Sequence, residues 1–269
     1  MKFIDLRMPT DDELRVSSER WAEAVSPCFI DHWPRELMAL SAPTDFVVLP
    51  QDCTALFDET RERGSFKKFA APIANEIDCI TGFDRKFFRL NSRSPKDAPW
   101  PFELPVSCSG KEMLSVMAAS ERMLDDLCYF SHSTVPPKLC LREFWPGVRA
   151  ELEFRCFIKD RRILAVAEYL NRHQDHQWVV PAKEDDASLR SQIDDYLTNT
   201  VIPRLHIDTV VVDLCRLKEW RLLEINPYGL SDPVGAESYA AIENTVPFIA
   251  RLPRQASGAV DAAKGETDG

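Results

Sequence analysis

Acidic residues in two neighbouring apolar segments are the most informative feature of the sequence. Asp213 follows the valine run 210–212, and Glu224 and Asn226 stand two apart within the segment 221–227. Side chains two apart on a strand share a face, and pairing of the two segments would bring Asp213 opposite them. Two carboxylates and an amide oxygen that converge in this way suit Mg²⁺ carrying nucleotide phosphates. The alternative is that all three are solvated polar residues at the edge of a hairpin.

Positive charge is concentrated in one short stretch of an otherwise acidic chain. Five basic residues fall within the twelve positions from Arg85 to Lys96, although the formal net charge of the protein is -10. Phe88 and Leu90 would face one side of a strand here and Arg89 the other. A cation at a strand end that leads into a loop neutralises phosphate oxygens well. The alternative is a solvated basic face.

A third group of polar residues follows a strand pattern over 138–145, which ends at Pro146 and Gly147. A strand that enters such a turn exposes backbone groups, and these can pair with the edge of an adenine. In the next strand Glu153 and Arg155 share one face, so a carboxylate could bind ribose hydroxyls while the arginine reaches phosphates. The alternative is a structural Glu–Arg pair across a hairpin, which contributes little when it is exposed.

Composition and motifs exclude several classes of protein. The acidic balance argues against a nucleic-acid binder or a protein of anionic membrane surfaces, since both need clustered positive charge. No apolar run reaches 18 residues and the start has no leader pattern, so no membrane span or signal peptide is expected. Glycine spacing rules out the dinucleotide fingerprint and the P-loop. Eight cysteines without CxxC spacing indicate a reducing, cytoplasmic setting rather than a zinc site.

Hydrophobic periodicity predicts several hairpins and two helices in mixed order, and therefore an α+β protein rather than a βαβ array. We expect a helix over 111–130 and a second helix over 188–200, capped by Ser188. The strands are expected at 46–49, 86–90, 138–145, 153–158, 163–169, 209–214 and 220–225. The small, polar tail 254–269 is expected to be disordered.

Taken in order, these groups resemble an ATP-grasp nucleotide site, and more narrowly the cell division cycle protein 123 family of the ATP-grasp superfamily. The matching segments are 28–50, Arg89–Ala98 (RLNSRSPKDA), Glu153–Ile158 (EFRCFI), Asp213 after its valines, and Glu224–Gly229 (EINPYG). The resemblance spans about residues 28–240. It implies an α+β, ATP-grasp-like fold with two α+β subdomains and the nucleotide bound between antiparallel sheets. We expect one domain over 1–253, with an N-terminal subdomain over about 28–135 and a C-terminal nucleotide and metal subdomain over about 136–253.

The resemblance also implies a role for nine side chains. Arg89 would contact phosphates, Arg142, Glu143 and Phe144 would form the adenine hinge, Glu153 would bind the ribose, Arg155 would lie near the phosphates, and Asp213, Glu224 and Asn226 would hold Mg²⁺. Two positions depart from the family pattern while keeping their charge. Arg89 stands where lysine is usual, and Glu224 stands where aspartate is frequent. The acidic insertion typical of eukaryotic members is missing from the N-terminal third.

Two functions of different class follow from this resemblance. In the first, the protein binds ATP and Mg²⁺ and acts as an ATP-dependent assembly or interaction factor. The partner of its relatives is the gamma subunit of eukaryotic translation initiation factor 2. In the second, it is an ATP-dependent carboxylate–amine ligase or transferase that acts through an acyl phosphate on a peptide, amino acid or protein. The sequence has no recognisable acceptor site, so it leaves open whether ATP is turned over and what the second substrate is.

Overall fold

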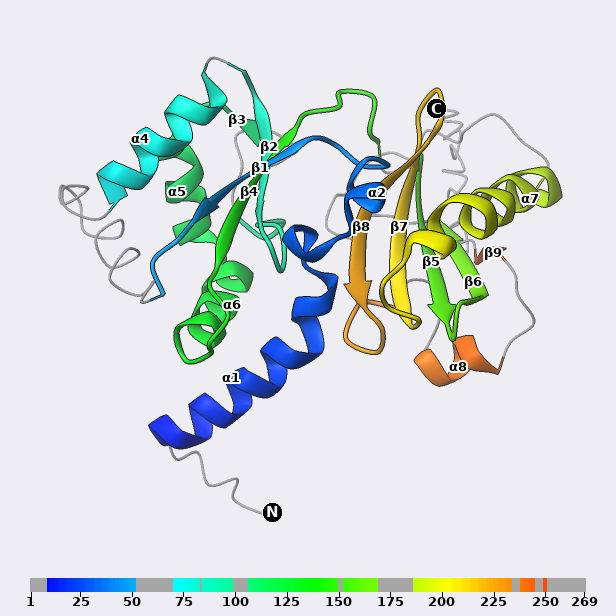
Figure 1. Cartoon of the computed structure of the whole chain (residues 1–269), viewed down its shortest axis with the longest axis horizontal. Coiled ribbons are helices and arrows are strands. Elements are labelled where there is room, and N and C mark those ends of the chain that lie inside the picture. Colours follow the sequence, from blue (N-terminus) through cyan, green and yellow to red (C-terminus); the bar gives the residue numbers. More distant parts are fainter. Residues whose placement is uncertain are drawn as a thin grey trace, which may run out of the picture.

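A computed structural model describes residues 9–51, 70–82, 84–98, 106–149, 152–168, 186–233, 238–244 and 249–250 of the chain. Two separate sheets dominate this part of the molecule (Figure 1). The first has the order β1 (Thr44–Val48), β4 (Lys138–Glu143), β2 (Lys86–Leu90) and β3 (Val106–Ser107). The second has the order β8 (Trp220–Pro227), β7 (Val210–Arg216), β5 (Glu153–Lys159), β6 (Arg162–Glu168) and β9 (Ile249–Ala250). All pairings are antiparallel except that of β6 with β9.

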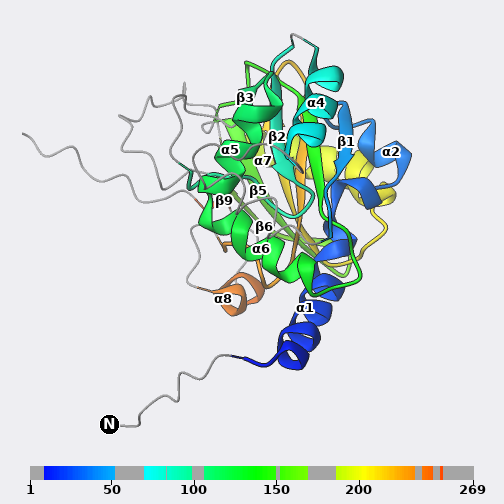
Figure 2. The same cartoon turned by 90° about the vertical axis from the view of Figure 1, so that its left-hand side faces the viewer.

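Helices pack on one face of the first sheet and on both faces of the second (Figures 1 and 2). The first sheet carries α4 (Ala70–Thr81), α5 (Gly110–Ala119) and α6 (Glu121–Ser131). The second sheet packs against α7 (Asp186–Tyr196), which continues as a π-helical turn over Leu197–Val201 and a 3-10 turn over Ile202–Arg204, and its other face carries α8 (Tyr239–Glu243). Each sheet with its helices is thus an α+β half.

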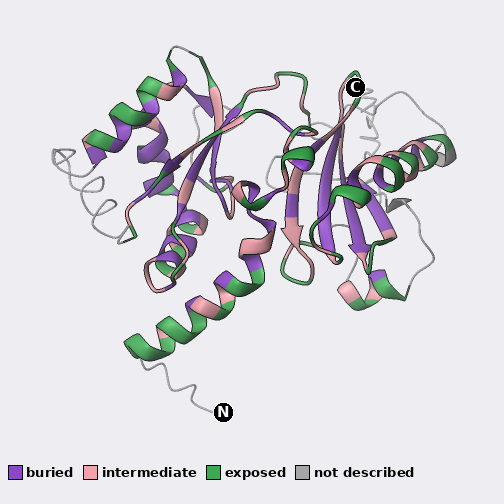
Figure 3. Cartoon of the chain, viewed as in Figure 1, coloured by how far each residue is buried: buried purple, intermediate pink, exposed green. Residues whose placement is uncertain are grey.

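Side chains alternate along β4, so that the first sheet has one apolar face in its core and one charged face toward the second half. Leu139 and Leu141 are buried in the core between the first sheet and its helices. Lys138, Cys140 and Arg142 alternate with them and therefore face the other way, toward the second half. Consecutive residues in the middle of β4 are buried (Figure 3), and because their side chains alternate, both faces of the strand are buried there. The inner face is therefore charged and yet removed from solvent.

An N-terminal segment, residues 25–41, ties the two halves together. It follows α1 (Asp11–Val25) and contains two 3-10 turns, Ser26–Cys28 and Ile30–His32, and α2 (Arg35–Met38). Phe29 is buried in the first core, whereas its neighbours Cys28 and Ile30 are buried in the second. Because consecutive side chains enter different cores, this segment is packed between the halves.

The helix predicted over 111–130 is wrong as a single element. The structure contains two helices, α5 and α6, with Ser120 in extended conformation between them (φ -92°, ψ 112°). Ser120 caps α6 by accepting a hydrogen bond from the backbone N–H of Met123 at 3.2 Å. Asp97 accepts from the Ser120 hydroxyl at 2.5 Å and from the Arg122 backbone N–H at 3.0 Å. A side chain distant in the sequence therefore stabilises the break, although the apolar spacing continues through it.

The other predicted elements have mixed outcomes. The hairpins β5–β6 and β7–β8 are confirmed. The second predicted helix begins earlier, at Asp186, so that Ser188 lies inside α7 and does not cap it. β4 belongs to the first sheet. The division into subdomains at about residue 136 stays a prediction. None of the helices in the described ranges is long and apolar enough to cross a membrane. The tail 254–269 lies outside the described residues.

Candidate functional site

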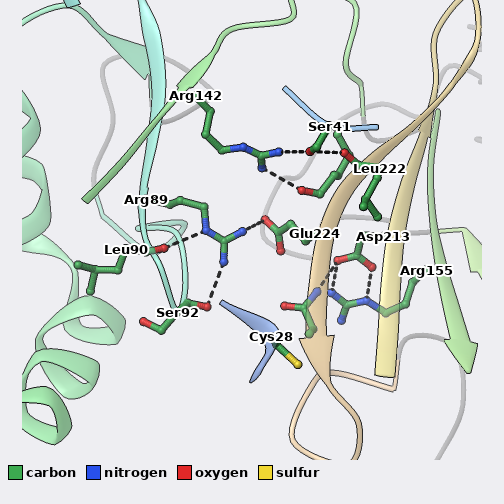
Figure 4. A network of polar contacts seen from close by, with 12 residues as sticks. Cys28, Ser41, Arg89, Leu90, Ser92, Arg142, Arg155, Asp213, Leu222 and Glu224 are labelled. Atoms are coloured by element: carbon green, nitrogen blue, oxygen red, sulfur yellow. Dashed lines mark hydrogen bonds and ion pairs between the residues drawn. The ribbon is translucent and has the colours of Figure 1, made fainter. Parts of the chain in front are cut away.

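The two halves meet at an ion pair between the predicted phosphate contact and a predicted metal ligand. Arg89 lies on β2 and Glu224 on β8, the edge strand of the second sheet, and Arg89 Nη1 lies 2.6 Å from Glu224 Oε1 (Figure 4). The remaining guanidinium nitrogens are also engaged. Nε donates to the carbonyl of Leu90 and Nη2 to that of Ser92, each at 3.0 Å. The hydrogen bonds to Leu90 and Ser92 thus orient the Arg89 side chain toward the second half.

A second arginine–carboxylate pair lies one strand further into the second sheet. Arg155 Nε and Nη2 bind Asp213 Oδ1 and Oδ2 at 2.8 and 2.7 Å, a bidentate arrangement in which both side chains are buried. Asn226 Nδ2 donates to the same Oδ2 at 2.9 Å. The pairing of β5, β7 and β8 sets this geometry, because Arg155 and Glu224 are each opposite Asp213 in the ladder. The paired strands therefore bring Asp213 beside Glu224 and Asn226, and the metal role of these three residues stays a prediction.

Arg142 closes the same interface from β4. Its Nη1 donates to the carbonyl of Leu223 at 2.9 Å and its Nη2 to the hydroxyl of Ser41 at 2.6 Å. Ser41 in turn donates to the carbonyl of Leu222, also at 2.6 Å. Burial, together with the charge of Arg89, lowers the pKa of Arg142 to about 10, which leaves it charged at neutral pH. The side chain of Arg142 is therefore engaged with the backbone of β8. An adenine hinge at residues 142–144 would have to use their backbone groups instead.

The two residues predicted to follow Arg142 in the hinge lie at the rim. The side chain of Glu143 is exposed, and its backbone N–H donates to the carbonyl of Pro43 at 2.8 Å. Phe144 is half-buried, and the guanidinium of Arg85 lies 5.6 Å from the centre of its ring. The role of these residues toward adenine stays a prediction.

Lys96 is a further candidate for the site, which the sequence reasoning did not single out. The loop after β2 is anchored at two places, by Arg93 on the buried Asp126 at 2.7 Å and by Asp97 at the start of α6. Between these anchors, the charge of Lys96 acts on both Glu153 and Glu224 of the second half. The only available signal was its membership of the basic stretch, which did not distinguish it from four other cations.

The electrostatic environment separates two nearby carboxylates. Burial raises the pKa of Glu153 to about 7, with Asp213 and Glu224 acting in the same direction and Lys96 against it. Burial acts to raise the pKa of Glu224 as well, but the charges of Arg89, Lys96, Arg142 and Arg155 lower it to about 2. Glu224 is therefore an anion at all ordinary pH values, whereas Glu153 changes its charge near neutrality.

The donor set fits Mg²⁺ in kind. Asp213 and Glu224 are opposite each other on neighbouring strands, and Asn226 turns its nitrogen to Asp213, which leaves its oxygen facing away. Two carboxylates and an amide oxygen are hard ligands of the type that Mg²⁺ prefers. Among the described residues, no three His, Cys, Asp or Glu side chains gather as a metal cluster. Any ion here would therefore need further oxygens from phosphate or water.

Two α+β halves, each built on a largely antiparallel sheet and joined through buried charged side chains, define a two-sheet α+β fold. Within this class the chain belongs to the D123 family, whose model matches residues 51–234. The resemblance to the cell division cycle protein 123 family is thereby confirmed.

Individual relatives agree with this assignment. The chain is 28% identical over 157 residues to a "Translation initiation factor eIF2 assembly protein" of Candida albicans, covering 53% of this chain and 44% of that one. It is 28% identical over 163 residues to "Cell division cycle protein 123" of Phaeosphaeria nodorum, covering 54% and 41%. The chain thus spans less than half the length of these relatives. The solved structure of Cdc123 from Schizosaccharomyces pombe shares the fold, with a TM-score of 0.64, 20% identity, and coverage of 90% of this chain and 98% of that one.

Proposed function

We propose that this protein binds Mg-ATP between its two sheets and acts as an ATP-dependent assembly factor for a protein partner. The observation that carries the proposal is the buried charged interface between the halves. Arg89 and Arg142 come from the first sheet, and Asp213 and Glu224 come from the second. Burying this many charged groups is costly unless they are paired or serve a charged ligand.

The residues of the candidate site form two groups, cations that suit the phosphates and oxygen ligands that suit the metal. Arg89, Lys96 and Arg155 are cations at one place and suit phosphate oxygens, because guanidinium groups bind them in forked geometry. Asp213, Glu224 and the oxygen of Asn226 suit the metal. Bound Mg²⁺ would offset the charge of the phosphates. Glu153, partly protonated near neutral pH, is suited to hydrogen bonds with ribose hydroxyls.

The assembly role rests on the names of relatives. Several are named as assembly proteins of translation initiation factor eIF2, including those of Candida albicans and Dictyostelium discoideum. We extend this role to the present chain as an interaction with a translation initiation factor subunit. The chain spans under half of the length of the first of these relatives.

Two measurements on one sample test the proposal. Saturating Mg-ATP should raise the melting temperature, since ligand at 100 times Kd adds about 2.7 kcal/mol, or roughly 5–10 °C for a chain of this size. ADP release, measured with and without the purified gamma subunit, separates the two classes of function. Binding without sustained turnover supports the assembly factor. Steady ADP formation that depends on an added amine or peptide acceptor would instead identify a ligase. An unchanged melting temperature at saturating Mg-ATP would contradict nucleotide binding altogether.

A further inference from the structure

Both carboxylates proposed to bind Mg²⁺ are already paired with an arginine. Asp213 accepts three hydrogen bonds, two from Arg155 and one from Asn226, at 2.7 to 2.9 Å (Figure 4). Glu224 pairs with Arg89 at 2.6 Å. The side chains of Arg89, Arg155 and Asp213 are less than a tenth exposed. In this state, both oxygens that a metal would use on Asp213 accept hydrogen bonds from the guanidinium of Arg155.

The balance of charge bears on what can enter. Four cations, Arg89, Lys96, Arg142 and Arg155, act on Glu224 in this interface. Asp213 and Glu224 in turn act on Glu153, whose pKa is raised to about 7. Mg²⁺ alone would add two positive charges beside arginines that already hold both carboxylates, which is unfavourable. A polyphosphate that accompanies the metal brings negative charge and offers oxygens to the arginines.

We infer that Arg155 and Arg89 occupy the metal-binding carboxylates until a polyphosphate arrives, so that Mg²⁺ and polyphosphate enter together by an exchange of ion-pair partners. This inference rests on the proposed Mg-ATP site and concerns its order of filling. Each guanidinium would pass from a carboxylate to phosphate, and each carboxylate would pass from a guanidinium to the metal. The number of charge-assisted contacts is thereby kept, which lets a buried site exchange its partners at small net cost.

Contacts to backbone carbonyls keep both arginines in place during such an exchange. Arg155 Nη1 donates to the carbonyl of Asp232, in the loop after β8, at 3.0 Å. Arg89 is held in the same way by the carbonyls of Leu90 and Ser92. Each guanidinium therefore remains at the site with part of its hydrogen-bonding capacity fixed, while the nitrogens that face the carboxylates are the ones to be transferred. Both residues are thus positioning residues for the metal as well as phosphate contacts.

The test is calorimetric titration of MgCl₂ without nucleotide into the wild type and Arg155→Gln. The wild type should bind Mg²⁺ alone only weakly, and Arg155→Gln should bind it roughly 10- to 100-fold more tightly, because the oxygens of Asp213 are released. Arg155→Lys, which keeps the charge without the fork, should lie between them. Arg190→Gln is the matched control, since Arg190 forms an ordinary pair with Asp194 on α7 at 2.8 Å. This variant should bind Mg²⁺ as the wild type does.

Equal affinity of the wild type and Arg155→Gln for Mg²⁺ would overturn the inference. Tight binding of Mg²⁺ alone by the wild type would do so even if the variant failed to fold. The outcomes also separate this inference from the proposed function. If Arg155→Gln gains Mg²⁺ affinity while the wild type binds Mg-tripolyphosphate but not Mg-ATP, the exchange stands and the nucleotide assignment fails. If the wild type binds Mg-ATP and Arg155→Gln gains no affinity for Mg²⁺, the nucleotide assignment stands and the exchange fails.

Discussion

Arg89 Nη1 and Glu224 Oε1 lie 2.6 Å apart and join the two sheets of the molecule through one ion pair. The arginine belongs to the central part of the first sheet and the glutamate to the edge strand of the second. Each is little exposed, at 7% and 16% of its side chain. The pair therefore contributes to the stability of the interface, and its two members are also the proposed contacts of phosphate and metal.

A double-mutant cycle on this pair should reveal coupling. Arg89→Gln alone leaves Glu224 without its closest cation and should lower the free energy of unfolding by on the order of 3 kcal/mol. Adding Glu224→Gln should recover part of this loss, with a coupling energy of about 1–3 kcal/mol measured by denaturant unfolding. Additive effects of the two substitutions would show that the pair contributes nothing to folding.

The same ion pair makes the stability of the protein depend on pH in the acid range. The pKa of Glu224 in the folded protein lies at about 2, below its ordinary 4.5. Its contribution to stability is therefore fully present above pH 4.5 and is lost as the pH falls toward 2. The difference in stability between wild type and Arg89→Gln should shrink in this window.

Glu153 should have the opposite effect on the pH dependence of stability. Its folded-state pKa of about 7 lies above the ordinary 4.5, chiefly because of burial. The folded protein then holds a proton that the unfolded chain loses, so the cost of Glu153 grows from pH 4.5 to 7 and remains above it. Glu153→Gln should stabilise the nucleotide-free protein by up to about 3 kcal/mol at pH 8 and hardly at all at pH 4.5. A pH-independent effect would mean that Glu153 is not held protonated.

Asp97 links the stability of α6 to the position of Lys96. Asp97→Ala removes the acceptor for Ser120 and for the Arg122 backbone N–H, which should cost about 1 kcal/mol. Because the loop that carries Lys96 loses this anchor, Mg-ATP affinity should also fall. Asp125→Ala, an exposed position on α6, is the control and should change neither quantity. Loss of stability with unchanged Mg-ATP affinity would show that the anchor does not serve the site.

Gly110 permits the close contact of α4 and α5. A Cβ atom at this position would lie 2.3 Å from the carbonyl oxygen of Ala74 and 2.7 Å from its Cα, both in backbone that has no room to move independently. Gly110→Ala should therefore destabilise the first half by roughly 1–3 kcal/mol in thermal unfolding. Gly82→Ala is the comparison, since nothing lies within 4 Å of its added atom and only its positive φ of 57° opposes the change. An effect of Gly110→Ala no larger than that of Gly82→Ala would show that the contact with Ala74 is relieved at little cost.

Local patterns predicted the second sheet better than the first half. The valines before Asp213 and the alternation around Glu224 define two strands, and a short turn between them fixes their pairing. The break at Ser120 was missed because Met117 and Leu124 continue one helical spacing across it. It exists because Asp97, far away in the sequence, supplies the hydrogen bonds.

The candidate site was predictable in its residue types but not in its partners. Period-two alternation puts Arg89 on the face opposite Phe88, and this required only the strand. That Arg89 meets Glu224, and that Arg155 holds Asp213, depends on how two sheets and the segment 25–41 pack together. Such contacts between distant segments leave no periodic signal in the sequence.

Binding of Mg-ATP between the halves is tested most directly by calorimetry on three proteins. The wild type should bind Mg-ATP. Lys96→Gln should weaken this binding roughly 10-fold or more and adenosine binding much less, since the proposed site puts its charge beside the phosphates and it acts on the ribose only through Glu153. Lys159→Gln, at the opposite end of β5 from Glu153, should bind both ligands as the wild type does. Failure of the wild type to bind Mg-ATP, or an equal loss of Mg-ATP and adenosine in Lys96→Gln, would contradict a phosphate site at this interface.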